Sequence, residues 1–317
     1  MCGLFGLYIY GENKKDYSRL LNELARATAE RGTHATGIAY NYGDRLRIYK
    51  RPLPADKMDF KHYDGVKAIM GHTRHATQGK ASDNINNHPF YGYADRTKFA
   101  SCHNGIIYND TELKKSELLP HSKIETDSYI LNQLIEKKNS LELSELARIT
   151  EKLQGYYTFT MLDQKNNLYI IKGDSPIEIY NFKKQNILIY ASTYEILKKA
   201  LKNSKIDIKQ GEKINIKDNT IYKITQNGEV ITEQFKPAET RCNWLNWWQY
   251  DEPKSKSKKE DNSYYNDIVS VARYYGYDKQ EIDELLEMGF TLEGIEEYLY
   301  TGEISDFVYT GEVDECF

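Results

Sequence analysis

Apolar runs separated by polar turns fill the first two thirds of the chain and predict its secondary structure. The run CGLFGLYIY at residues 2–10 is short, apolar and aromatic, which predicts a buried strand beginning at the chain terminus. Residues 16–30 carry apolar positions at helical spacing, and Arg31-Gly32 ends this pattern before a strand at GIAYNY. The chain therefore opens with a predicted strand, a helix and a second strand.

Later runs predict more strands on either side of two helices. The helices are expected at residues 126–138 and 141–153. Because strands come first, helices follow and strands return, the order favours an α+β layered fold over a doubly wound parallel sheet. The further strands are expected at GVKAIMGHT, KFASCHN, YYTFTMLD, NLYIIKG and NILIYAS.

The pattern changes after residue 236, where we expect the main domain, residues 2–236, to end. Residues 237–262 bring Trp244, Trp247 and Trp248 together and continue into the charged run DEPKSKSKKEDNS, which indicates a linker. Because clustered tryptophans are costly to leave in water, this segment is interpreted as an anchor for a partner protein. The alternative is that it covers the edge of the main domain.

Residues 263–317 contain three short amphipathic stretches separated by glycines and a threonine cap, which predict a small helical module. Met288-Gly289-Phe290, between two of these stretches, resembles the loop of ubiquitin-associated-like helical modules. A generic helical tail that packs on its own chain is the alternative.

Composition narrows the functional classes. The 317 residues include 43 Lys and Arg and 47 Asp and Glu, a formal net charge of -4, so no overall attraction to nucleic acid or to an anionic membrane is expected. A small-molecule substrate fits better. No apolar run approaches the roughly 20 residues that cross a bilayer, and the N-terminus lacks the basic region of a secretory signal, so we expect a cytoplasmic protein.

Neither a metal nor a cofactor is expected. The sequence has no Gly-rich phosphate loop, and its cysteines form no CxxC pair that would indicate a structural zinc or a disulfide framework. The histidines of the polar loops sit at no spacing that demands zinc, and a two-histidine metal site is the alternative. The cysteines are Cys2, Cys102, Cys242 and Cys316, and the histidines are His72, His75, His88 and His103.

Cys2 has a specific chemical use once Met1 is removed, because one residue then carries both a thiol and an α-amine. An α-amino group has a pKa of about 7.7 to 8.0 and can accept the thiol proton, whereas an amide nitrogen could not. Removal of Met1 is therefore expected to be obligatory, and Gly3 leaves room for close backbone approach. Taken alone, a cysteine at position 2 is more often a small buried residue.

Three further segments carry polar groups suited to an amino-acid substrate. In GHTRHATQG, the Arg74 guanidinium can bind an α-carboxylate through two hydrogen bonds, or it can form a surface salt bridge. In HNGIIYN, Asn104 and Gly105 offer two donors for an oxyanion, or the pair forms a type I′ hairpin turn. Asp127 heads a predicted helix, where it either caps the helix or pairs with an α-ammonium group.

Five ordered motifs resemble the class II glutamine amidotransferase domain, most closely the glutaminase half of glucosamine-6-phosphate synthase. They are MCGLFG, ERGTHATGIA, GHTRHATQG followed by NHPF, HNGIIYN and ETDSY. The resemblance extends from residue 2 to about residue 235. It implies a four-layer αββα sandwich of the N-terminal-nucleophile hydrolase type, here followed by the small C-terminal helical module, and hydrolysis of L-glutamine through a thioester.

The resemblance also implies roles for single residues. Cys2 would be the nucleophile, and Asn104 with Gly105 would form the oxyanion hole. Arg74 and Thr77 would contact the carboxylate and main chain of glutamine. Asp127 would pair with its α-ammonium group, and His88 would support the pocket.

The chain departs from the family pattern at four positions. The motif that commonly reads RGxDSxG is RGTHATG, so His34 and Ala35 stand at the acidic and hydroxyl positions. His75 stands where a tryptophan often follows the arginine, and Gln78 stands where a histidine is common. These departures motivate an alternative, a regulatory protein of the same fold that binds an amino acid without turning it over.

No acceptor half is apparent after residue 236, where nothing is large enough for a sugar isomerase, a phosphoribosyltransferase or an ATP-pyrophosphatase domain. The resemblance therefore implies that ammonia is delivered to a separate synthetase subunit. A free glutaminase is the alternative.

Overall fold

The computed structural model describes residues 2–11 and 15–238 and part of the C-terminal region. There it describes residues 277–287 and single positions at 265, 268, 269, 272, 273, 292, 295 and 299. The chain divides into two compact units, Met1–Thr240 and Arg241–Phe317, and each is described by itself. The predicted tryptophan-rich segment, the charged run and Met288-Gly289-Phe290 lie outside the described residues.

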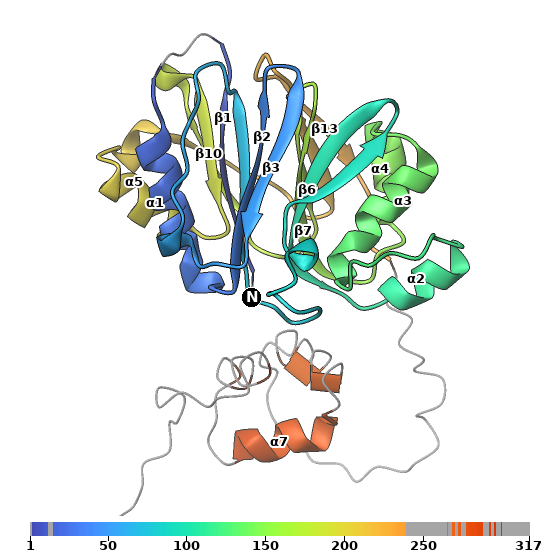
Figure 1. Cartoon of the computed structure of the whole chain (residues 1–317). Helices are drawn as coiled ribbons and strands as arrows, with labels where there is room; N and C mark the ends of the chain where they lie inside the picture. The colour runs from blue at the N-terminus through green and yellow to red at the C-terminus, as the bar shows by residue number, and fades with distance from the viewer. Residues whose placement is uncertain are drawn as a thin grey trace, which may run out of the picture. The chain divides into compact units, whose positions relative to one another are not determined.

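The first unit contains two antiparallel sheets (Figure 1). The seven-stranded sheet has the order β11-β9-β10-β1-β4-β2-β3, and the six-stranded sheet has the order β13-β12-β8-β7-β6-β5. In the first sheet the strands are β1 (Gly3–Ile9), β2 (Ala35–Tyr42), β3 (Arg45–Arg51), β4 (Ala68–Arg74), β9 (Glu178–Phe182), β10 (Ile187–Ala191) and β11 (Glu212–Ile214). In the second they are β5 (Phe90–Ala94), β6 (Thr97–Ile107), β7 (Gly155–Asp163), β8 (Leu168–Lys172), β12 (Thr220–Ile224) and β13 (Val230–Gln234).

Helices cover the outer face of each sheet. One apolar cluster joins α1 and α5 to the first sheet, a second joins α3 and α4 to the second sheet, and a third lies between the sheets. The resulting order of helices, sheet, sheet and helices confirms the predicted α+β sandwich (Figure 1). The helices are α1 (Ser18–Thr28), α2 (Asp110–Ser116), α3 (Ile130–Lys138), α4 (Leu143–Thr150) and α5 (Tyr194–Asn203).

Strand β1 lies near the middle of the first sheet, between β10 and β4, and all of its residues are buried. Phe5, Leu7 and Ile9 face the helices, whereas Leu4 and Tyr8 face the second sheet. A strand buried on both faces reads as a continuous apolar run, which is why CGLFGLYIY was recognisable from the sequence. The residue before this strand, Cys2, is therefore held at the end of a rigid element.

Strand β10 lies within the predicted strand NILIYAS, and α5 begins shortly after it. The Thr193 side chain accepts a hydrogen bond from the Ile196 backbone N–H at 3.3 Å, which caps the start of this helix.

The second unit has a small apolar core of its own around α7 (Lys279–Glu287). Asp278 and Glu281 form a reciprocal capping box, because each backbone N–H donates to the side chain of the other, at 2.6 and 3.0 Å. This helix lies within residues 263–317, where amphipathic stretches predict a helical module. None of the helices in the described residues has the length and apolar character that a bilayer crossing requires.

Candidate functional site

The Cys2 thiol lies at the end of β1, next to the end of β4. It is half-buried and donates a weak hydrogen bond to the His75 carbonyl at 3.4 Å, while Arg31 Nε donates to the Cys2 carbonyl at 2.9 Å. Burial raises the pKa of the Cys2 thiol, and the positive charge of Arg74 lowers it in part. A thiol with a raised pKa needs a base before it can attack a substrate.

Two glycines let other segments approach the nucleophile closely. A Cβ at Gly3 would lie 2.2 Å from the Thr28 side chain and 2.7 Å from that of Thr73. A Cβ at Gly32 would lie 2.4 Å from the Arg74 carbonyl carbon. The Arg31-Gly32 turn therefore packs directly on the backbone at Arg74.

Arg74 is a buried cation held by neutral oxygens. Its Nη1 donates to Asn87 Oδ1 at 2.7 Å, and its Nη2 donates to the carbonyls of Gly79, at 2.9 Å, and Gln78. None of the ion pairs found among the described residues includes Arg74, so the surface salt bridge considered from the sequence is not present there. A buried charge without a counter-ion favours binding of an anion.

Asp127 supplies a charge of the opposite sign. It opens the 3₁₀ turn Asp127–Tyr129 that leads into α3, so the predicted helix start is confirmed. Its carboxylate accepts hydrogen bonds from the Ile107 backbone N–H at 2.6 Å and from the Ser128 hydroxyl at 3.2 Å. Burial raises the pKa of Asp127 to about 6, and these hydrogen bonds lower it in part. The carboxylate is thus ionised at neutral pH but close to its titration range.

Asn104 and Gly105 lie inside β6, where they pair with Thr158 and Tyr157 of β7, so the hairpin-turn interpretation is wrong. Gly105 has φ of +137°, and a Cβ there would lie 1.8 Å from the Tyr156 carbonyl oxygen. The Asn104 side chain is fully buried, and neither its Nδ2 nor its Oδ1 has a hydrogen-bond partner. A buried donor without an acceptor is costly, which suits a group that waits for a ligand oxygen.

His88 lies in a buried stack of aromatic rings. Its ring centroid is 4.1 Å from that of His72 and 4.2 Å from that of Phe90, and both of its nitrogens are buried without a partner. Burial lowers the pKa of His88 well below its usual value, so the ring is neutral. His72 Nε2 in turn lies 2.9 Å from the His103 carbonyl and joins the two sheets. Thr77 is exposed on the loop after β4.

Within the described residues, no group of three or more His, Cys, Asp or Glu side chains is placed to hold a metal ion.

The departures from the family pattern meet around one loop, residues 75–79. Ala35 pairs with Arg74, and the His34 backbone N–H donates to the Arg74 carbonyl at 3.0 Å. The His34 ring accepts a hydrogen bond from the Ala76 backbone N–H at 2.9 Å and stacks on His75 at 4.9 Å. Gln78 lies in the same loop. Three of the four departures, His34, His75 and Gln78, thus belong to this loop or contact it, and Ala35 pairs with the residue before it.

Two supporting residues were not predicted from the sequence. Asn87, whose side chain accepts from Arg74, belongs to the NHPF motif, so its position in that motif was the available signal. Its carbonyl accepts a hydrogen bond from the Lys50 ammonium, and burial lowers the pKa of Lys50 to about 8. Lys50 belongs to β3, a strand that the apolar pattern did not indicate.

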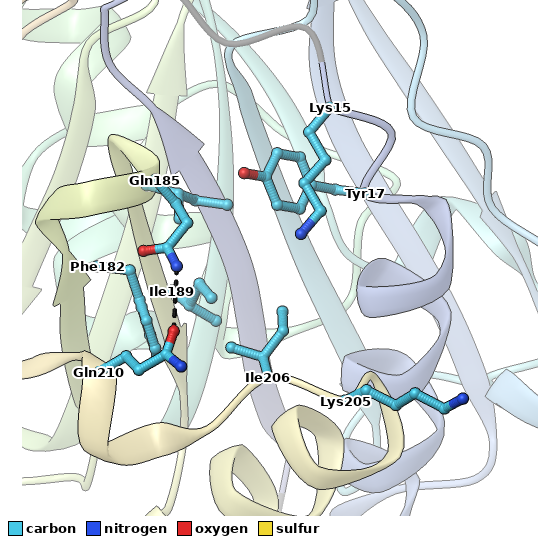
Figure 2. Close-up of a pocket in the computed structure, with 9 residues that line it drawn as sticks. Lys15, Tyr17, Phe182, Gln185, Ile189, Lys205, Ile206 and Gln210 are labelled. Atoms are coloured by element: carbon cyan, nitrogen blue, oxygen red, sulfur yellow. Dashed lines mark hydrogen bonds between the residues drawn. The ribbon is translucent and has the colours of Figure 1, made fainter.

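A small pocket of about 90 Å³ is lined by Ile187, which pairs with Ile9 at the other end of β1, and by the residues labelled in Figure 2. Its walls include Tyr17, Ile189 and Ile206, and a 3.2 Å hydrogen bond joins Gln185 to Gln210 (Figure 2). The seven residues of β1 span roughly 20 Å at about 3.3 Å per residue, so this pocket is separate from the nucleophile. The candidate site is instead the polar region around Cys2.

Comparisons with known proteins agree with the fold and the motifs. Residues 72–199 match the family described as a glutamine amidotransferase domain. The glutamine–fructose-6-phosphate aminotransferase (isomerizing) of Listeria monocytogenes is 29% identical over 302 residues, which cover 90% of this chain and 48% of the relative. The corresponding protein of Thermococcus kodakarensis is 31% identical over 245 residues, covering 73% of this chain and 38% of the relative. The chain thus spans about half the length of these relatives or less.

A solved structure shows the same fold. The glutamine phosphoribosylpyrophosphate amidotransferase of B. subtilis, complexed with ADP and GMP, matches with a TM-score of 0.58 at 19% identity. The match covers 74% of this chain and 49% of that one.

Proposed function

Because this chain carries a class II glutamine amidotransferase domain of the N-terminal-nucleophile type, related to that of glucosamine-6-phosphate synthase, we propose that it hydrolyses L-glutamine to glutamate and ammonia through a thioester on Cys2. The observation that carries this proposal is the position of the Cys2 thiol beside Arg74, a buried cation without a carboxylate partner among the described residues. Asp127 lies near enough to both groups to influence their pKa values.

The two charges suit the two ends of an amino acid. A zwitterionic substrate needs one cation for its carboxylate and one anion for its ammonium group. In the proposed complex, Arg74 and the hydroxyl of Thr77 bind the α-carboxylate, and Asp127 binds the α-ammonium group. The neutral, buried ring of His88 forms part of the surroundings of this pocket.

The reaction begins after removal of Met1. The α-amine of Cys2 takes the thiol proton, and the thiolate attacks the side-chain amide carbon of glutamine. The oxyanion that forms accepts hydrogen bonds from the Asn104 side chain and the Gly105 backbone N–H. The α-ammonium of Cys2 then returns its proton to the leaving nitrogen, so ammonia departs and a thioester remains. Water attacks the thioester, the amine again accepts a proton and passes it back to the sulfur, and glutamate leaves.

The ammonia has a proposed destination outside the described domain. The names of the two relatives describe aminotransferases. We propose that ammonia passes from Cys2 to an acceptor site on a separate synthetase subunit. The tryptophan-rich segment at residues 237–262 is the proposed anchor for that subunit.

The decisive experiment measures intact mass and glutamate release from L-glutamine for the unsubstituted chain, Cys2→Ala and Cys102→Ala. Cys102 is a matched control, because it is a second cysteine buried between the sheets. Loss of Met1 together with glutamate release that disappears only in Cys2→Ala is the expected result. A processed chain that binds glutamine and releases no glutamate, even with candidate partners, would support the regulatory alternative instead.

A further inference from the structure

One residue of the loop after β4 contacts both charged groups of the site. The Gln78 backbone carbonyl accepts a hydrogen bond from Arg74 Nη2. The Gln78 side-chain oxygen, Oε1, accepts a hydrogen bond from the Asp127 backbone N–H at 3.1 Å. Gln78 therefore joins the cation and the anion through its main chain and its side chain respectively.

This connection matters because the two charges come from different layers. Arg74 ends a strand of the first sheet, whereas Asp127 precedes α3, which covers the second sheet. The Asp127 carboxylate is fixed to β6 through Ile107, but its backbone is tied to the Arg74 loop through Gln78. A carboxylate and a guanidinium that bind one small zwitterion must keep a set separation, since a misplacement of about 1 Å weakens both contacts.

A second tie comes from Asn86, farther along the same connection between β4 and β5, and holds that connection to the segment before α3 without touching the charges. The Asn86 side chain donates to Glu125 at 3.0 Å and accepts from the Glu125 backbone N–H at 2.9 Å. Loss of the Gln78 side chain would therefore leave this connection and the segment before α3 attached to each other. Its effect should fall on the position of Asp127 rather than on folding.

We propose that Gln78 is the positioning residue that sets the separation between Arg74 and Asp127, and that it thereby selects an α-amino acid over amides that lack the α-ammonium group. This inference rests on the proposed function, because it takes glutamine as the ligand of the two charges. The family commonly has a histidine at this position, whose ring is shorter and presents its acceptor in another direction. The glutamine side chain reaches the Asp127 backbone with an oxygen that accepts at any ordinary pH.

The test is a binding measurement that needs no turnover. In a Cys2→Ala background, calorimetry compares L-glutamine with 4-carbamoylbutanoate, which has the same amide and carboxylate but no amino group. We expect a preference of about 30-fold for glutamine, as one charged hydrogen bond gives. Gln78→Met, which has similar length and no strong acceptor, should reduce this preference to about threefold and leave the affinity for 4-carbamoylbutanoate within about twofold. Gln78→Glu keeps the acceptor oxygen and should keep most of the preference at pH 8.

A matched control removes the side-chain half of the other tie and leaves the backbone half, from the Glu125 N–H to Asn86, in place. Glu125→Ala takes away the exposed partner of Asn86 on the same segment and should leave the glutamine preference unchanged. An unchanged preference in Gln78→Met would overturn the proposal, as would an equal loss of affinity for both ligands, which indicates a structural role only.

The two proposals fail differently. If the Cys2→Ala chain binds glutamine but the unsubstituted chain releases no glutamate, the proposed hydrolysis fails and the Gln78 proposal is still decided by binding. If neither ligand binds the Cys2→Ala chain, the Gln78 proposal is overturned, and glutamate release by the unsubstituted chain still decides the proposed hydrolysis.

Discussion

Gly3 pairs with Thr73 across β1 and β4, which places Cys2 beside Arg74. The nucleophile and the cation are thus held by the register of two buried strands rather than by loops. A slip of one residue would turn each side chain to the opposite face of the sheet. The pairing of the two strands therefore sets the separation between Cys2 and Arg74.

Arg74→Lys should impair glutamine binding even though it preserves the charge. Lysine presents a single ammonium group in place of a planar fork, so it cannot hold Asn87 and the Gly79 carbonyl and also bind a carboxylate. We expect kcat/KM for glutamine to fall by about 100-fold, equivalent to about 3 kcal/mol, mainly through KM. Steady-state glutamate release measures this change. Arg26→Lys, at an exposed helix ion pair, is the control, and equal KM values for the two variants would contradict the assigned role.

Glutamine binding should weaken in acid because of Asp127. Burial raises the pKa of this carboxyl to about 6, and only its ionised form attracts an ammonium group. We expect KM for glutamine to rise about tenfold for each pH unit below 6, and to be flat between pH 7 and 8. Asp127→Asn should have a high KM that no longer changes through this range. A pH profile that is unaltered by this substitution would assign the titration to another group.

The buried carboxylate of Asp127, when ionised, should lower the free energy of unfolding. Because its pKa is raised in the folded chain, the folded state holds more protons than the unfolded state between about pH 4 and 6, so its contribution to the free energy of unfolding falls as pH rises through this window. The full difference is about 3 kcal/mol at neutral pH. Asp127→Asn keeps an oxygen acceptor for Ile107 and should therefore raise the free energy of unfolding at pH 7 by about 1 to 3 kcal/mol. Urea denaturation at pH 4 and pH 7 measures this, and an increase at pH 4 as large as that at pH 7 would disprove the titration argument.

Gly105→Ala should disrupt β6. Its φ of +137° is strained for any side chain, and the new Cβ would lie 1.8 Å from the Tyr156 carbonyl oxygen, which is backbone and cannot move aside. We expect a loss of about 3 kcal/mol or more in the free energy of unfolding. Gly43→Ala is the matched control, because Gly43 also has positive φ, +56°, but no atom within 4 Å of an added Cβ. The control should lose about 1 kcal/mol.

His34→Ala should loosen the loop at residues 75–79. It removes the acceptor for the Ala76 N–H and the ring that stacks on His75. We expect a rise of about fivefold in KM for glutamine, as the loss of one hydrogen bond implies, with thermal stability almost unchanged because His34 is exposed. His121→Ala, at another exposed histidine, should leave both quantities unchanged. A fall in thermal stability without a change in KM would place His34 in the fold rather than in the site.

The sequence predicts most of the buried strands of both sheets and misses β3, β5, β9, β11, β12 and β13. Strand β1 and the predicted strands that follow it read as continuous apolar runs. Strand β12 is missed although it is mostly buried, because a lysine interrupts its short run of five residues. Strand β3, RLRIYKR, is missed because it is an edge strand with three arginines and Tyr49 exposed on one face and only half-buried side chains on the other. Its lysine, Lys50, was missed with it.

The sequence motifs name the individual residues of the candidate site, but they do not predict that these residues lie close together in the fold. The motifs single out Cys2, Arg74 and Asp127, yet their proximity depends on strand register and on contacts between the two sheets, which no local pattern contains. Asn104 and Gly105 show the limit clearly, because an Asn-Gly pair suits both a hairpin turn and a strand with positive φ. Only the pairing of β6 with β7 decides between these two structures.

Strand β1 begins directly after Cys2, and one of its two neighbouring strands is made late in the synthesis of the chain. The Leu4 backbone N–H donates to the Ser192 hydroxyl at 2.7 Å, across 188 positions of sequence, and β10 forms one whole edge of β1. A growing chain on the ribosome has no β10 until nearly two hundred residues have emerged, and contacts of such separation form slowly. The thiol therefore acquires its rigid setting only after most of the first unit exists, so chains that stop early should neither hydrolyse glutamine nor release ammonia.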